Sequence, residues 1–186
     1  MRDGQREHGA GRQKGRRIAG TRVNRVCDSQ VIASGHMDLT TVDGPLTARQ
    51  CKGTITARSV DGSLELRNVQ GDISARTVDG TISLEGVFQT LEAGSTDGSI
   101  HATVEPGSRM GGEWSIRSVD GSIRIELPQD FSADLEARTG DGHIRCDYPV
   151  TVSGSVDKHR LIGKINGGGN LFKVQSSDGS ISIIKF

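Results

Sequence analysis

The amino-acid sequence predicts an all-β chain that winds, from Gly35 to Phe186, into a single-domain parallel β-solenoid. Three observations predict this fold. A turn of the form Ser/Thr-x-Asp-Gly recurs along the chain, glycine falls at nine-residue intervals, and apolar and polar residues alternate between the glycines. The 186 residues are also only 33% hydrophobic and 3% aromatic, a composition that suits a thin core repeated many times better than one thick core.

Each nine-residue unit predicts one short strand. The second and fourth residues after the glycine position are apolar in eight successive units, and the residue between them is mostly polar. This alternation is typical of a strand with one buried face. The seventh residue is most often valine and is predicted to point inward at the corner. The inward strand sites are Met37, Leu39, Leu46, Ala48, Ile55, Ala57, Leu64, Leu66, Ile73, Ala75, Ile82, Leu84, Leu91, Ala93, Ile100 and Ala102.

The true repeat is 18 residues, with two strands and two different corners in each coil. Asp precedes the glycine position in every second unit, whereas Lys52, Gln70 and Phe88 take that place in the units between. Like corners are therefore expected to stack at about 4.8 Å, the ordinary spacing of strands. About eight such coils fit between Gly35 and Phe186.

The later coils are predicted to stack in chain order. Asp-Gly corners recur at Asp120, Asp141 and Asp178, and we interpret the longer spacings as small insertions. Loops are expected near 106–112 and 128–132. Residues 150–169 lose the register, and a final unit starting at Asn170 recovers it.

The first 34 residues lie outside the repeat. Residues 1–22 are basic and rich in Gly and Arg, which predicts a disordered tail, and residues 23–34 predict an irregular lead-in or cap. Residues 1–25 hold eight Arg or Lys against two acidic residues, so the remainder has 15 basic and 21 acidic residues. We find no apolar run that could span a membrane and no recognisable export signal, so the localisation stays unknown at this point.

The ordered series of motifs resembles a bacterial adhesin-type β-solenoid family, a domain family of unknown molecular function. The resemblance is carried by the repeated Ser/Thr-x-Asp-Gly-Ser/Thr-Ile/Leu units, by Trp114–Ile125 and Leu127–Leu135, and by the closing stretch Gly163–Ile183 with its glycine triplet. It covers about 150 residues. It implies a one-domain β-solenoid, frequently exported or tethered to a membrane, and it supplies no catalytic residues.

Two sets of charged residues are candidates for binding. An Asp column could hold calcium, but Asp-Gly is also favoured corner chemistry, and the double-glycine pattern of calcium-binding solenoids is absent. The arginine rows would place Arg49 over Arg67 and Arg58 over Arg76, where anionic polysaccharide or phospholipid headgroups could bind, although nearby Glu65, Asp72 and Glu85 could neutralise them. The column consists of Asp43, Asp61, Asp79, Asp97, Asp120, Asp141 and Asp178.

Cysteine and histidine give no site. Cys51 and Cys146 are predicted to be inward core residues about five coils apart, too far to bridge, and Cys27 lies outside the repeat. His8, His36, His101, His143 and His159 are dispersed, without the spacing of metal ligands. We therefore assign no catalytic, metal or cofactor residues.

The sequence favours a non-enzymatic structural or interaction protein, adhesin-like and associated with the bacterial cell envelope. Its expected partner is a protein or glycan surface, with no specific nucleic acid, and its terminal strand edges are open to self-association. The alternative is a polysaccharide-acting β-helix enzyme, although such small insertions would wall an active-site cleft poorly. Ice binding would need a regular Thr-x-Thr column, and only Thr54-Ile55-Thr56 fits.

Overall fold

The described part of the chain, residues 34–152 and 157–186 of a computed structural model, contains strands and no helix. The predicted tail and lead-in lie outside these residues, except that Ser34 begins the first strand. The strands are β1 (Ser34–Thr40), β2 (Leu46–Arg49), β3 (Lys52–Arg58), β4 (Leu64–Asp79), β5 (Ile82–Asp97), β6 (Ile100–Val104), β7 (Trp114–Ser118), β8 (Ile123–Leu127), β9 (Ala133–Thr139), β10 (Ile144–Cys146), β11 (Val150–Val152), β12 (Arg160–Ile165), β13 (Leu171–Ser176) and β14 (Ile181–Lys185).

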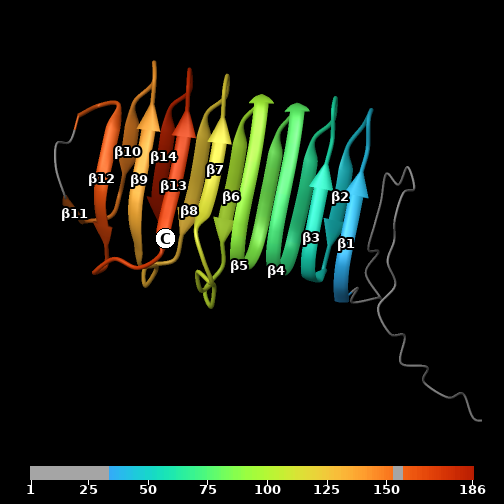
Figure 1. Ribbon diagram of the computed structural model, residues 1–186, viewed down its shortest axis with the longest axis horizontal. Coiled ribbons are helices and arrows are strands. Elements are labelled where there is room, and N and C mark those ends of the chain that lie inside the picture. The colour runs from blue at the N-terminus through green and yellow to red at the C-terminus, as the bar shows by residue number, and fades with distance from the viewer. Residues whose placement is uncertain (1–33, 153–156) are drawn as a thin grey trace, which may run out of the picture.

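The strands stack as parallel rungs of two, as predicted. In the first part of the chain most residues pair with the residue 18 positions further on, as in Met37 with Ile55 and Leu64 with Ile82, and a register shift makes the offset 17 at Val69–Gly71. The 16-residue strands β4 and β5 bend around a corner and so contribute to both faces of the stack. Figure 1 shows the resulting row of rungs. The prediction of an all-β, solenoid-like chain is confirmed.

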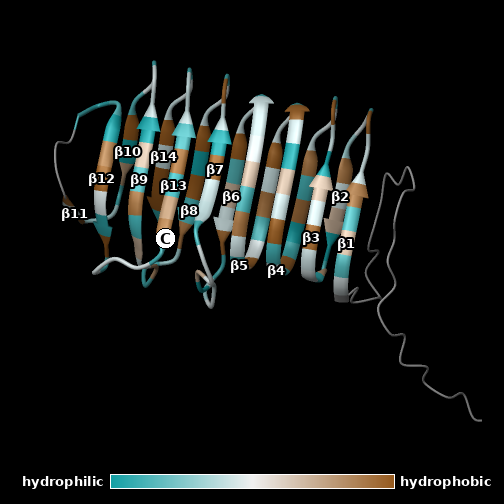
Figure 2. Ribbon diagram, viewed as in Figure 1, coloured by the Kyte–Doolittle hydropathy of each residue, from teal (hydrophilic) through white to brown (hydrophobic). Residues whose placement is uncertain are grey.

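The core is the thin column that the alternation predicts. All sixteen inward strand sites are buried, with at most 4% of any side chain exposed. Figure 2 shows the matching alternation of hydrophobic and hydrophilic bands along the strands. A single rung could not shield its small apolar cluster from water, but stacking joins these clusters into one continuous core.

The prediction of an inward valine at every corner is wrong at the Asp-Gly corners. Val42, Val60, Val78 and Val119 are 43–54% exposed, whereas Cys51 and Val69 at the opposite corners are buried. At the third opposite corner Val87 is only half-buried, and Phe88 is buried in its place. At the Asp-Gly corner the residue two positions before the Asp points inward instead. It is always Ser or Thr: Thr41, Ser59, Thr77, Ser95, Ser118, Thr139 and Ser176.

Five of these seven inward hydroxyls, all but those of Thr41 and Ser59, form a ladder that links neighbouring rungs. Ser118 Oγ donates to the carbonyl oxygen of Gly98 at 3.0 Å, and Ser176 Oγ donates to that of Gly121 at 3.0 Å. Ser176 Oγ also accepts a hydrogen bond from Gly179 N at 3.0 Å. The Ser or Thr of the motif, rather than the expected Asp, therefore caps the turn, which satisfies a buried hydroxyl and backbone groups together.

Glycine is required at this corner by close stacking more than by backbone angle. A Cβ atom on Gly98 would lie 2.0 Å from the carbonyl oxygen of Gly80, and one on Gly121 would lie 2.1 Å from that of Gly98. Only Gly44 and Gly80 in this column have a positive φ. Glycine recurs because the corners of adjacent rungs leave no room for a side chain.

The prediction that the later rungs stack in chain order is also wrong. The last rung, β13 and β14, lies between the rung of β7 and β8 and the rung of β9 and β10. The ladder follows the same order, since Thr139 Oγ1 donates to Gly179 O at 2.7 Å. The described residues thus form seven rungs of two strands, and antiparallel β12 and β11 follow beyond β9.

An aromatic cluster fixes the inserted rung. Phe172 at the start of β13 lies 6.0 Å from Trp114 and 5.9 Å from Phe131, measured between ring centroids. Phe131 belongs to the loop 128–132, which steps from β8 past the inserted rung to β9. The two expected insertions, 106–112 and 128–132, do form loops, and both lie at the corner opposite the Asp-Gly turns.

We predict that Gly98→Ala strongly destabilises the protein, whereas Gly94→Ala does not. A Cβ atom at position 98 would overlap the Gly80 carbonyl oxygen, and such overpacking should cost about 3 kcal/mol or more of unfolding free energy. At Gly94 the nearest atom to an added Cβ is Arg76 Cγ at 3.9 Å, so alanine should be neutral or stabilise by up to about 1 kcal/mol. Urea unfolding of both variants measures the difference, and equal losses would contradict the stacking argument.

The rung order predicts which engineered disulfides can form. Lys173 pairs with both Ser115 and Glu136, so a cysteine at 173 should bond to a cysteine at either position. A Ser115→Cys, Glu136→Cys pair would be about 9.6 Å apart, two strand spacings, and should remain reduced. Mass-spectrometric mapping after mild oxidation shows which disulfide bonds have formed. An efficient disulfide between positions 115 and 136 would contradict the inserted rung and would show that the rungs stack in chain order.

Candidate functional site

A groove of about 870 Å³ runs along the Asp-Gly corner and crosses the strands. It lies where β3, β4, β5, β7, β13 and β9 end, which is the upper edge in Figure 1. The corner residues that turn inward, from Ser59 to Ser176, form its floor. Because both insertions lie at the opposite corner, no loop of the described residues interrupts the groove, and one groove spans several rungs.

One wall of the groove is a row of arginines. The residue three positions before the Asp of each Asp-Gly turn stacks on its counterpart in the next rung, and the row reads, in spatial order, Arg58, Arg76, Gly94, Arg117, Gln175 and Arg138. All four arginines are exposed. Arg76 pairs with Glu92, and Arg138 Nη2 lies 2.8 Å from Glu136 Oε1. Arg58 and Arg117 form no ion pair within the described residues, so this wall carries uncompensated positive charge.

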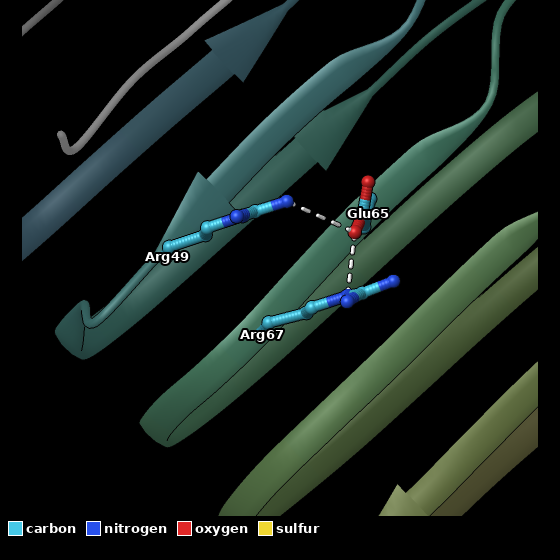
Figure 3. Close-up of polar contacts among 3 residues, drawn as sticks. All are labelled: Arg49, Glu65 and Arg67. Atoms are coloured by element: carbon cyan, nitrogen blue, oxygen red, sulfur yellow. Dashed lines mark hydrogen bonds and ion pairs between the residues drawn. The ribbon is translucent and has the colours of Figure 1, made fainter. Parts of the chain in front are cut away.

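In the arginine row on the other corner, both arginines share one acidic partner. Arg49 and Arg67 are neighbours in register, as predicted, and both point to Glu65, with Arg49 Nη2 at 3.5 Å from Glu65 Oε1 (Figure 3). The predicted pairing of Arg58 with Arg76 is also confirmed. Glu65 thus offsets one of the two positive charges, part of the expected neutralisation, whereas Asp72 accepts a hydrogen bond from Thr90 Oγ1 at 2.9 Å instead.

The other wall carries the exposed corner residues Val78, Thr96 and Val119. Within the arginine row, Gly94 has no side chain and therefore leaves a notch between Arg76 and Arg117. It lies inside β5 and has neither a positive φ nor a crowded Cβ position. A glycine in a strand interior weakens the strand, and such a position often marks a place where another molecule or backbone approaches closely.

The Asp column lines the outer side of the valines. A side-chain hydrogen bond with Asp97 raises the pKa of Asp120, with partial desolvation and the neighbouring Asp178 adding to the shift. Desolvation, then the hydrogen bond and charge of Asp97 and the charge of Asp61, raises the pKa of Asp79. The backbone register shows the same stacking, since Asp43 pairs with Asp61 and Asp79 with Asp97 in neighbouring rungs.

The remaining candidates do not converge. No group of three or more His, Cys, Asp or Glu side chains among the described residues is arranged to hold a metal ion. His36 in β1, His101 in β6 and His143 just before β10 are exposed on different rungs, as predicted, and His143 Nδ1 lies 3.0 Å from Ser180 Oγ. Cys51 is buried in an early rung, whereas burial raises the pKa of the half-buried thiol of Cys146 in a late one. His8 and Cys27 lie outside the described residues.

Sequence reasoning found half of the arginine row. The 18-residue period pairs Arg58 with Arg76, but Arg117 and Arg138 follow insertions, and the rung order separates them by Gln175. Counting back from each Asp-Gly turn would have found both, because each arginine lies three residues before its Asp. The notch at Gly94 occupies the same position.

A stack of parallel two-strand rungs with a groove across its strands defines a solenoid-like, all-β protein. Residues 76–184 match the family model Toastrack DUF4097, a domain of unknown function. The match covers more than half of the chain, and the chain therefore belongs to this family. Searches of curated proteins and of solved structures found no match. No helix among the described residues is long and apolar enough to cross a membrane.

We predict that Asp97→Asn lowers the pKa of both Asp79 and Asp120. The folded-state pKa of each is raised, so the folded chain takes up protons more readily than the unfolded chain does. The stability that these two groups contribute should therefore be fully present below pH 3.8, the ordinary pKa of Asp. It should be lost as the pH rises through the raised folded-state pKa values of Asp79 and Asp120. The variant should therefore flatten the pH dependence of stability in that window.

Carboxyl-carbon NMR titration measures the two pKa values directly. Asp43→Asn is the matched control, because Asp43 lies at the far end of the column and bridges to Asp61 alone. It should leave both values unchanged. An unaltered titration of Asp79 and Asp120 in Asp97→Asn would show that the carboxylates do not interact.

Proposed function

We propose that this protein is a non-enzymatic, adhesin-like interaction module of the bacterial cell envelope, and that its groove is the binding surface. The observation that carries the proposal is the groove itself, one unbroken hollow that spans several rungs and combines exposed arginines with exposed valines. Binding sites commonly join apolar lining with a few placed polar groups. The envelope location is supported by the resemblance of the repeat motifs to exported β-solenoids.

The rigidity of the rungs also supports a binding role. Backbone atoms at the corner are already paired between rungs, for example Asp120 N with Thr96 O at 2.8 Å and Asp178 N with Val119 O at 2.9 Å. The groove is therefore preformed, and little ordering should accompany binding. A polysaccharide-acting enzyme would need an acid and a base that converge on one bond. The groove residues are mainly Arg, Ser, Thr and Val, and Asp178 alone supplies a carboxylate.

Filling the notch at Gly94 tests the proposal. We expect wild type and Gly94→Ala to co-sediment with washed bacterial envelopes, and Gly94→Phe to lose that binding, because the ring would occupy the groove. Unfolding curves confirm that both variants are folded. Equal sedimentation of all three proteins, or of none, would refute a groove-dependent envelope module. Release of shortened glycans from the envelopes would favour the enzyme.

A further inference from the structure

We propose that the groove binds a linear acidic polysaccharide, whose carboxylates pair with Arg58, Arg76, Arg117 and Arg138 along the stack. This inference rests on the proposed function, since it names the ligand class of the same groove. The four arginines form a row of separate positive charges that no described counter-ion cancels at Arg58 or Arg117. Guanidinium groups match carboxylates in a two-pronged geometry, which favours a carboxylated ligand.

The row matches a polymer in direction and in spacing. The arginines lie on the second, third, fifth and seventh rungs, because the final rung with Gln175 lies between Arg117 and Arg138. At about 4.8 Å per rung, the charges are separated by roughly 5, 10 and 10 Å along the groove. A linear chain with acidic groups at regular intervals can contact all of them, whereas a small anion can contact one or two.

An extended peptide fits the groove less well. Peptides that bind in an extended form usually gain affinity by adding a strand to an open sheet edge. Here the backbone groups are taken up between rungs, as in the bond from Asp79 N to Val60 O at 2.8 Å, and the hydroxyl of Ser118 is bonded to Gly98. Recognition must come from the arginines and from the apolar surfaces of Val78 and Val119, which can contact the C–H groups of sugar rings.

The Asp column restricts the ligand to a narrow one. Asp79 and Asp120 are exposed one residue beyond the groove valines and run parallel to the arginine row. A flat anionic surface such as a membrane would face arginines and aspartates together, and repulsion from the column would oppose its binding. A thin chain in the groove contacts the arginines and leaves the carboxylates in water. The notch at Gly94 gives a sugar ring space between Arg76 and Arg117.

Calorimetry with polygalacturonate, a linear polyuronic acid, tests the inference. The wild type should bind this polymer, binding should weaken as salt rises, and the fully methyl-esterified polymer of the same backbone should not bind. Arg58→Gln combined with Arg117→Gln should weaken binding about tenfold, since two exposed charge-assisted contacts are lost. Arg49→Gln combined with Arg67→Gln is the matched control, with two exposed arginines removed from the opposite corner and little expected effect.

Each alternative outcome overturns the inference in a recognisable way. No binding of polygalacturonate, equal binding of its ester, or equal loss in the two double variants would exclude carboxylate recognition in the groove. Equal or tighter binding of poly-L-glutamate would assign the groove to acidic peptides. If Gly94→Phe abolishes envelope binding while polygalacturonate does not bind, only this inference fails. If Gly94→Phe leaves envelope binding unchanged, the proposed function fails, whether or not polygalacturonate binds.

Discussion

The structure depends on the close approach of equivalent corners in neighbouring rungs. At the Asp-Gly corner the backbone of one rung lies so near the next that a Cβ on Gly98 would stand 2.0 Å from a carbonyl oxygen. That proximity excludes side chains at the glycine, brings the hydroxyl of the preceding Ser or Thr to the neighbouring carbonyl, and leaves valine and aspartate outside. Because every rung obeys the same geometry, each position of the motif becomes a column on the surface.

The sequence predicts the strands well because burial alternates with period two inside them. Leu64, Ile73 and Ile82 lie in the core as expected. The alternation does not extend through the turn, and there the prediction fails. Hydrophobicity alone places Val78 inside and Thr77 outside, but hydrogen bonding decides the corner, since an inward hydroxyl can satisfy the neighbouring rung while an inward valine would leave that carbonyl unpaired. Thr77, which donates to Gly62 O at 3.2 Å, illustrates this preference.

The order of the rungs could not be predicted from the same motif, because any two rungs with an Asp-Gly corner are compatible neighbours. The spacing between motifs does not settle the order either. A loop of five residues can be a bulge in one coil, or it can carry the chain past the space for another rung. Long-range packing decides between the two. Phe172 packs against both Trp114 and Phe131, which come from the rungs on either side of the inserted one. Asn166 Nδ2 also donates to Phe131 O at 2.8 Å and so ties the returning chain to the same loop.

This rung order shapes the groove as much as the motif does. In chain order Arg117 and Arg138 would be adjacent and would repel each other, whereas the inserted rung separates them by Gln175 and spreads the positive charge along the stack. The opposite corner shows the other solution, in which Glu65 lies between Arg49 and Arg67 and cancels much of their charge. Arg58 and Arg117, which form no ion pair within the described residues, gain little for folding, because exposed arginines contribute little stability. Their uncompensated charge is available instead to a linear anion that lies along the groove.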